Sequence, residues 1–404
     1  MMNLYNLLDE INLMRGQSWI RQHEVPMQHT PVLWPDPISH LAQARPDHPV
    51  MYFAPEKLAA TAARFAAGFR GQVTYAVKAN DRLDVLHTLV QAGIDAFDVA
   101  SPAEIASVRR ASATAVLHYN NPVRSDAEVA AGQRAGVASW SVDDAQELAR
   151  LAHLGARGEV AVRFALPIKG AAYDFGQKFG ATPEAAVILL QRAVQLGFAP
   201  ALCFHPGTQC AAPQVWADYI AAAAQIATRA GVRIRRLNVG GGFPAHLTGA
   251  APDLERHFAT IHTAVQQVFG ADAPDLLCEP GRAMAAECAS VAVRIKALRA
   301  DGRVFLNDGI YGGLADLRDM GAPDRRRVVS VDGALRTGPM TPRVLFGPTC
   351  DSLDRIPGCV DLPVQTQPGD YLIFDAMGAY SIVMATGFNG YGLQEVVTVR
   401  QTGA

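Results

Sequence analysis

Lys78 ends an apolar segment, Thr74-Tyr75-Ala76-Val77-Lys78, whose β-branched and aromatic residues are typical of a strand. Lysine is rarely fully buried unless it is paired or used chemically. An amine held in a low-dielectric site has a lowered pKa and can act as a nucleophile toward a carbonyl group. A single strand-end lysine is more often simply exposed to solvent, so the other polar residues of the chain must decide between the two interpretations.

Several of those polar residues also fall at the ends of predicted strands. Asp98 ends the second strand, Arg163 lies in the fifth and His205 ends the sixth. Gly240-Gly241-Gly242 follows the seventh strand, and Glu279-Pro280-Gly281-Arg282 ends the eighth. In a barrel of parallel strands the working residues gather at the carboxyl ends of the strands. Core packing does not explain polar residues in this register, so the pattern indicates an active site at that end.

The elements that must position these residues alternate short β-branched runs with alanine-rich helical stretches from about residue 70 to 285. Repeated βα units predict a parallel sheet, and eight of them predict a closed (β/α)8 barrel. A doubly wound open sheet is the alternative, but a Rossmann fold carries its glycine cluster after the first strand rather than the seventh. The predicted strands are 75–78, 97–99, 117–119, 140–142, 160–164, 202–205, 237–239 and 276–279, and the predicted helices include 102–110, 126–135, 144–154, 183–196 and 215–230.

The pattern changes after about residue 290. Short apolar segments near 291–295, 304–306, 344–346, 371–374 and 396–400 are separated by Gly, Pro and Asp, which predicts a mainly antiparallel β domain. We therefore assign residues 50–285 to the barrel, and residues 1–49 and 286–404 to the β domain. The run Arg325-Arg326-Arg327 is interpreted as part of a solvated loop.

The composition limits the class of protein. With 404 residues, 50% of them hydrophobic and 18% charged, the chain is long enough for two packed domains. A net charge of −2 gives no basic surface for nucleic acid, and no apolar stretch approaches the length of a membrane span. The first residues lack the pattern of a secretory signal, and the six cysteines form no C-x-x-C pair. We expect a cytoplasmic protein with no metal site and no disulfide framework.

The residues around the glycine run suit a cofactor with a phosphate and an aromatic ring, although each has an ordinary alternative. Three glycines after a strand let backbone N–H groups converge on a phosphate, but they also make a tight turn. Arg282 can clamp a phosphate, and Thr208 offers a hydroxyl. Glu279 can keep a pyridine nitrogen protonated or pair with a cation, and His205 can stack on a ring or be an ordinary strand-end histidine. With Lys78, these are the parts of a pyridoxal phosphate site.

The motifs resemble those of the ornithine/lysine/diaminopimelate decarboxylases, which share the alanine-racemase-like fold of pyridoxal phosphate enzymes. They occur in family order from about residue 70 to 392, and together they are highly specific. Alanine racemases of the same fold are disfavoured, because they carry arginine where this chain has Glu279. The motifs are Tyr75-Ala76-Val77-Lys78-Ala79-Asn80, Asp98-Val99-Ala100-Ser101, His205-Pro206-Gly207-Thr208, Gly240-Gly241-Gly242-Phe243-Pro244, Cys278-Glu279-Pro280-Gly281-Arg282 and Gly347-Pro348-Thr349-Cys350-Asp351-Ser352.

The resemblance implies roles around the cofactor. Lys78 is expected to bind pyridoxal phosphate covalently, Glu279 to pair with its ring nitrogen and His205 to stack on its ring. Asp98 and Arg163 are expected to support the surroundings of the ring. The residues expected to hold the phosphate are Thr208, Gly240, Gly241, Gly242, Gly281, Arg282 and Tyr380.

The resemblance also implies a homodimer with shared active sites. Cys350 is similar to the family cysteine that crosses from the partner subunit and protonates the α-carbon after carbon dioxide leaves. Asp351 is similar to the residue that receives the distal ammonium of a diamino acid. Lys178 and Asp354 match an interface pair of the family. Tyr311, Asp319 and Phe388 are the further expected substrate contacts.

The expected substrate is a basic diamino acid, with L-ornithine or L-lysine first, because relatives that act on diaminopimelate carry glutamate in place of Asp351. The second acidic residue of the family falls where this chain departs from the pattern, and both Asp316 and Asp319 are available. Thr208 and Pro206 replace the usual serine and β-branched residue. Diaminopimelate, carboxynorspermidine, arginine or an amino acid of a specialised pathway is therefore the alternative. An inactive regulatory homologue is disfavoured, since the lysine, glutamate and cysteine of the motifs are all retained.

Overall fold

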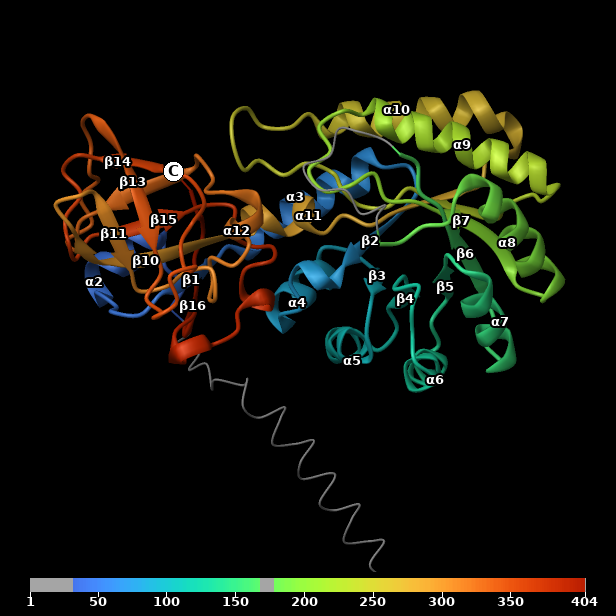
Figure 1. Ribbon diagram of the computed structural model, residues 1–404, viewed down its shortest axis with the longest axis horizontal. Helices are drawn as coiled ribbons and strands as arrows, with labels where there is room; N and C mark the ends of the chain where they lie inside the picture. Colours follow the sequence, from blue (N-terminus) through green and yellow to red (C-terminus); the bar gives the residue numbers. More distant parts are fainter. Residues whose placement is uncertain (1–31, 168–177, 404) are drawn as a thin grey trace, which may run out of the picture.

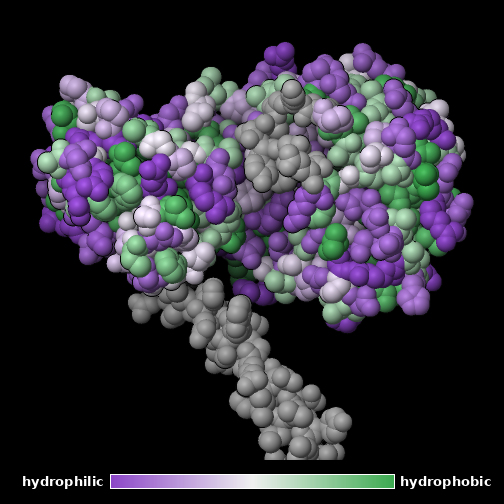
Figure 2. All heavy atoms as spheres, viewed as in Figure 1, coloured by the Kyte–Doolittle hydropathy of each residue, from purple (hydrophilic) through white to green (hydrophobic). Residues whose placement is uncertain are grey.

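The structure is a computed structural model that describes residues 32–167 and 178–403. Figure 1 shows two bodies along the long axis, a strand barrel surrounded by helices on the right and a second sheet on the left. The predicted (β/α)8 barrel and the additional β domain are both confirmed. Polar residues predominate on the barrel surface in this view, with apolar ones scattered among them (Figure 2). No helix in the two described ranges combines the length and apolar character needed to cross a membrane.

The barrel consists of eight parallel strands that pair in chain order. It closes where Gln72 and Val73 of the first strand pair with Leu277 and Cys278 of the last. Each predicted strand overlaps an observed one, which begins one to three residues earlier. The strands are β2 (Gln72–Ala76), β3 (Ala96–Val99), β4 (Val116–Tyr119), β5 (Ser139–Val142), β6 (Glu159–Arg163), β7 (Ala199–Cys203), β8 (Arg236–Asn238) and β9 (Asp275–Cys278).

Several helices of the barrel begin at residues that cap them. The side chains of Ser101, Ser125 and Thr182 each accept a hydrogen bond from the backbone N–H three residues later, which satisfies a donor that the first turn leaves unpaired. The predicted helices agree with the observed bounds to within one residue. The helices are α3 (Pro55–Gly68), α4 (Leu83–Gln91), α5 (Pro102–Ala111), α6 (Asp126–Ala135), α7 (Ala145–His153), α8 (Pro183–Gln195), α9 (Gln214–Ala230) and α10 (Leu254–Phe269).

The second body is an eight-stranded mixed sheet in which antiparallel pairs predominate. Its first strand, β1 (Val50–Phe53), pairs antiparallel with β10 and parallel with β16. The strand therefore belongs to this sheet, although the expected boundary at residue 50 grouped it with the barrel. The other strands are β10 (Ala289–Leu298), β11 (Arg303–Leu306), β12 (Arg326–Val329), β13 (Met340–Phe346), β14 (Val360–Pro363), β15 (Tyr371–Phe374) and β16 (Glu395–Thr398).

The arginine run is the clearest error of the sequence-based interpretation. Arg326 and Arg327 lie in strand β12, which pairs with β15, rather than in a solvated loop. Arg327 donates to Asp375 over 2.5 Å, and both side chains are largely buried. The sequence alone does not reveal this strand, because the arginine charges are neutralised by residues that are distant in the sequence.

Hydrogen bonds join the two bodies at the carboxyl end of the barrel. Asn80 donates to the carbonyl of Gly378 over 2.9 Å, and the N–H of Tyr380 donates to the carbonyl of Ala79 over 2.8 Å. The segment that follows β15 is thus fixed directly to the turn that carries Lys78. The remaining helices are α2 (Pro37–Ala44), η1 (Val77–Ala79), η2 (Gly270–Asp272), α11 (Arg282–Ala285), η3 (Ala286–Cys288), α12 (Leu317–Met320), η4 (Ile382–Met384) and η5 (Phe388–Gly390).

Candidate active site

Two cavities at the carboxyl end of the barrel share Lys78, Asp98, His205 and Glu279 as walls. One is a narrow space of about 30 Å³ and the other a wider one of about 300 Å³. The sequence therefore identified the residues that converge, although most of them lie just beyond the strands rather than on them. The narrow cavity is also lined by Ala76, Thr208, Gly242, Phe243, Gly281, Arg282 and Tyr380, and the wider one by Asn120, Arg163, Lys178, Phe179 and others.

Lys78 lies in the turn η1 directly after β2. Burial by itself lowers its pKa, but Tyr380 and the carboxylates of Asp98 and Glu279 outweigh that effect and raise the pKa above its usual value. The expectation of a lowered pKa is therefore wrong for the cofactor-free chain. The side chain remains accessible to solvent, because the cavities open beside it.

Asp98 and Glu279 form an acidic pair that shares the cavity walls with Lys78. Burial raises the pKa of Glu279 to about 8, and the nearby Asp98 adds to the effect. Burial also raises the pKa of Asp98, against the attraction of Lys78. Two neighbouring buried acids resist losing both protons, so the pair retains a proton at neutral pH.

His205 is held as a neutral imidazole. Burial lowers its pKa, and the charges of Lys78 and Arg163 lower it further. Its Nδ1 accepts the backbone N–H of Gly207 over 3.1 Å, which leaves the proton of the neutral ring on Nε2. A flat, uncharged ring on a wall of both cavities suits stacking against an aromatic cofactor.

The glycine run forms a turn that admits no side chain. Gly240 and Gly242 have positive φ angles of 70° and 81°. A Cβ on Gly242 would lie 2.1 Å from the carbonyl oxygen of Gly207, and one on Gly241 would lie 3.2 Å from Nε2 of His205. The backbone therefore comes close to the cavity, as a phosphate cradle requires.

Arg282 is less free to clamp a phosphate than its motif suggests. Its Nη1 and Nη2 donate to the carboxylate of Asp316, and its guanidinium lies over the ring of Tyr380, 4.8 Å from the centroid. Its Nε is buried and has no hydrogen-bond partner among the described residues. That unsatisfied donor, the hydroxyl of Thr208 and the glycine turn fit a phosphate group in the narrow cavity.

The two candidate aspartates for the second acidic position have different surroundings. Asp316 is buried against Arg282, whereas Asp319 of α12 is exposed and pairs with Arg318 over 2.9 Å. Neither lines either cavity of this chain.

The residues expected to contact substrate form a separate cluster on the β domain. Tyr311 donates to Asp351 over 2.6 Å, and its ring lies 5.1 Å from that of Phe388. Cys350 is exposed, and its thiol donates to Oδ1 of Asn389 over 3.3 Å. We call these five residues the β-domain cluster; none of them lines either cavity of the same chain.

Asp354 joins the two loops that carry this cluster. Its carboxylate is buried and accepts the N–H of Ile310 and both the N–H and the hydroxyl of Thr349. Lys178, its expected partner across an interface, lines the wider cavity of this chain and lies 5.0 Å from the centroid of the Phe179 ring.

Sequence reasoning assigned no role to two asparagines that contact Glu279. Asn120 and Asn238 both donate to Oε1 of Glu279, the former over 2.5 Å. Asn120 directly follows β4, and Asn238 ends β8. The signal was present, because both residues are polar and stand at the ends of barrel strands.

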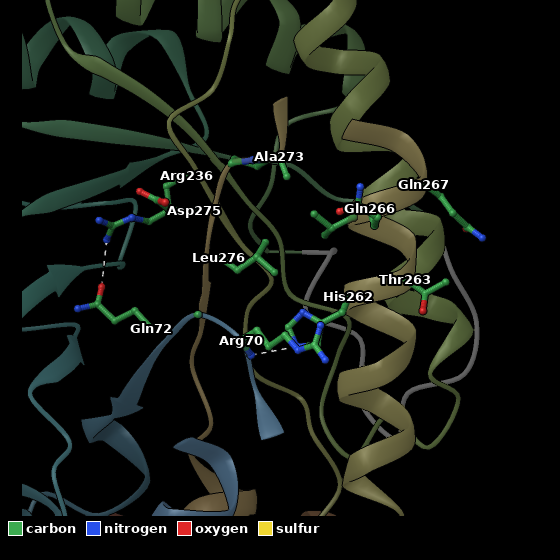
Figure 3. Close-up of a pocket in the computed structure, with 13 residues that line it drawn as sticks. Arg70, Gln72, Arg236, His262, Thr263, Gln266, Gln267, Ala273, Asp275 and Leu276 are labelled. Atoms are coloured by element: carbon green, nitrogen blue, oxygen red, sulfur yellow. Dashed lines mark hydrogen bonds between the residues drawn. The ribbon is translucent and has the colours of Figure 1, made fainter. Parts of the chain in front are cut away.

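A hollow larger than either of these cavities lies at the opposite end of the barrel. It measures about 940 Å³ and is lined by Arg70, Gln72, Arg236, His262 and others near the starts of β2, β8 and β9 (Figure 3). Arg236 donates to Gln72 over 3.2 Å there, and the N–H of Arg70 donates to His262 over 2.9 Å. Barrel enzymes work at the other face, so size alone does not identify the site.

Comparisons with known proteins agree with the geometry. Residues 55–286 match the family model described as "Pyridoxal-dependent decarboxylase, pyridoxal binding domain". The chain is 32% identical to ornithine decarboxylase of Panagrellus redivivus, over 78% of this chain and 77% of that protein. It is 28% identical to lysine/ornithine decarboxylase of Selenomonas ruminantium, over 81% and 83%.

A solved structure is similar over nearly the whole described fold. The arginine decarboxylase of Paramecium bursaria Chlorella virus, bound to agmatine, superposes with a TM-score of 0.78 at 25% identity, covering 87% of this chain and 97% of that one. Because the match covers 87% of this chain, it includes residues of both bodies. The chain belongs to the pyridoxal-dependent decarboxylase family.

Proposed function

We propose that this protein removes the carboxyl group of a basic amino acid, with L-ornithine or L-lysine preferred, using pyridoxal phosphate bound at Lys78. The observation that carries the proposal is the convergence of Lys78, the Asp98–Glu279 pair and the glycine turn on one cavity. The named decarboxylases among the relatives support the reaction and the class of substrate.

Each residue that lines the cavity has a role in the proposed reaction. When bound, pyridoxal phosphate supplies an electron sink for the electrons that the departing carboxylate leaves behind. Lys78 provides the amine for covalent attachment, and Glu279 holds a proton at the ring nitrogen. His205 supports the ring face. Nε of Arg282, the glycine turn and Thr208 bind the phosphate; Asp98, Arg163, Gly281 and Tyr380 complete the walls.

We further propose that the β-domain cluster of one subunit completes the cavity of a second copy in a homodimer. Within a single chain Cys350 is exposed and does not line the cavity that holds Lys78. Leu353, three residues after Cys350, is 70% exposed, and Phe388 of the β-domain cluster is 42% exposed. A second subunit would cover these apolar side chains. The β domain would then supply this side of the interface.

In that arrangement Cys350 returns a proton to the α-carbon once carbon dioxide has left. Asp351 receives the distal ammonium of the substrate, because the hydrogen bond from Tyr311 lowers the pKa of Asp351 and keeps it ionised. Asp319 is the candidate for a second acidic contact, because Asp316 is engaged by Arg282. A thiol that gives up a proton must stay reduced, which favours the cytoplasm as the working compartment.

Covalent capture of the cofactor tests the proposal. Purified protein with added pyridoxal phosphate should turn yellow, and borohydride should fix the cofactor on the peptide that contains Lys78. Lys78→Ala should abolish capture and carbon dioxide release, whereas Lys57→Ala, at a half-exposed lysine of α3, should retain both.

A substrate screen then separates the basic amino acids. Carbon dioxide release from ornithine or lysine should exceed that from arginine, diaminopimelate and carboxynorspermidine. A colourless protein that takes up no cofactor, or a yellow one that releases carbon dioxide from none of these, would be evidence against the proposed enzyme.

A further inference from the structure

Glu279 receives two hydrogen bonds on one of its two oxygens. Nδ2 of Asn120 and Nδ2 of Asn238 both donate to Oε1. A carboxylate oxygen has two lone-pair sites, so these donors fill Oε1. A proton on Glu279 can therefore reside only on Oε2, since a hydroxyl at Oε1 would point at one of the amide donors.

Asn238 is held in the orientation that makes it a donor. Its Oδ1 accepts the backbone N–H of Gly240 over 2.9 Å. A flipped amide would turn its NH2 group toward that N–H and its oxygen toward Glu279, losing both hydrogen bonds. The glycine turn thus fixes the amide, and the amide fixes the carboxylate.

Asn120 spans the two acids. Its amide donates to Glu279 and also acts as a hydrogen-bond donor to Asp98, where it lowers the pKa against the effect of burial. Its Oδ1 is buried and has no partner among the described residues. If the amide of Asn120 flipped, its oxygen would face both carboxylates, so the donor orientation is favoured.

We propose that Asn120 and Asn238 are positioning residues that fill Oε1 of Glu279 and so reserve Oε2 for the ring nitrogen of the cofactor. The inference rests on the proposed function and concerns its electron sink. Donors on Oε1 favour the ionised carboxylate. The shared proton is thereby held on the ring nitrogen rather than on Glu279, which keeps the ring able to accept electrons.

The first test compares pyridoxal phosphate with an analogue that has carbon in place of the ring nitrogen. Asn120→Ala should weaken the affinity for pyridoxal phosphate by about tenfold or more, as expected for a lost hydrogen bond to a charged group. The affinity for the analogue should change less than about threefold, because it offers Glu279 no nitrogen. Asn120→Leu, nearly the same size, removes the amide donors without leaving a cavity or adding a third carboxyl group, and should give the same selective loss.

The matched control is the neighbouring Asn121→Ala. Asn121 also lines the wider cavity, but its amide donates to the carbonyl of Ala100 over 3.4 Å, and no hydrogen bond joins it to Glu279 among the described residues. It should change the two affinities by the same factor. A second readout is the nitrogen-15 NMR shift of ring-labelled pyridoxal phosphate, which should move toward the unprotonated value in Asn120→Ala and stay at the wild-type value in Asn121→Ala.

Two results distinguish failure of this inference from failure of the proposed function. Equal weakening of cofactor and analogue by both Asn120 variants, with an unchanged nitrogen-15 shift, would show that Asn120 merely supports the fold. A wild-type protein that binds neither compound and is not labelled by borohydride would instead refute the pyridoxal phosphate site itself.

Discussion

Single carboxyl groups around the barrel mouth set the charge of the site before any cofactor binds. Together with Tyr380, the carboxyl groups of Asp98 and Glu279 raise the pKa of Lys78, so the amine carries its positive charge at neutral pH. Both acids are themselves harder to ionise than in water, because they are buried next to each other. The same physical cause acts on Glu104 of α5, which lies beside the strand-end loop and accepts the N–H of Ala100 over 2.8 Å.

Glu104 gives a pH prediction for the stability of the cofactor-free protein. Burial raises its pKa to about 7, and Asp98 contributes to the increase. In the unfolded chain the carboxyl ionises at about pH 4.3, whereas in the folded state it keeps its proton up to about pH 7. The free energy of unfolding therefore falls as the pH rises from about 4.3 through 7. Glu104→Gln should remove part of this decline, measured as the urea midpoint between pH 5.5 and 8.5.

Glu184→Gln is the matched control for that measurement. Glu184 is exposed, and hydrogen bonds to the backbone and to Arg229 lower its pKa, so it does not titrate in this pH range. The control should follow the wild-type pH dependence. If Glu104→Gln followed it as well, the assigned pKa of Glu104 would be wrong.

Among the elements, β12 shows how a charged sequence forms a strand at the edge of the sheet, where it pairs with β15. Arg327 donates to Asp375 and to the carbonyl of Thr402, and Asp375 also accepts the hydroxyl of Ser290. These contacts join β12, β10, the end of β15 and the C-terminal segment. Because both side chains are mostly buried, removing one partner leaves an uncompensated charge.

Arg327→Ala should accordingly lower the free energy of unfolding by about 3 kcal/mol. Arg303→Ala breaks an exposed ion pair with Asp301 and should leave stability nearly unchanged. Chemical denaturation of both variants checks the contrast. Similar midpoints for the two variants would mean that the buried pair contributes no more than the exposed one.

The elements also show where sequence reasoning succeeds and where it stops. The barrel could be predicted because its strands and helices alternate with local signals, such as the capping serines Ser101 and Ser125. The role of Arg327 could not, since its partner lies 48 residues away in the chain. Likewise Arg282 and Lys78 were found from their motifs, but the competition of Asp316 for Arg282 depends on tertiary contacts.

For the molecule as a whole, the residues of the proposed site divide between the two bodies. The barrel carries Lys78 and Glu279, and the β domain carries Cys350 and Asp351, which do not line the cavities of their own chain. The sequence located both groups through their motifs. It could not show their separation within a subunit, because that depends on how the sheet docks on the barrel.

Subunit exchange tests whether two copies share their sites. Lys78→Ala and Cys350→Ala should each be nearly inactive, and random exchange yields about half heterodimers with one intact site of two. About a quarter of wild-type activity should therefore return on mixing, measured as carbon dioxide release.

Lys78→Ala mixed with Glu279→Ala is the control, because both lesions lie in the barrel and no heterodimer site would be intact. It should show no recovery. Equal recovery in the two mixtures, or none in either despite demonstrated exchange, would contradict a site built from two subunits.

Tyr380 limits how such a protein can be rearranged by recombination. It adopts a left-handed backbone with φ of 55°, bonds through its N–H to Ala79 and lies under Arg282. It also stands outside residues 55–286, the segment that the family model covers. A barrel transferred to another protein without its own Gly378–Ser381 segment would lose one wall of the narrow cavity and a fixed neighbour of Lys78. We therefore expect the two bodies to be inherited together.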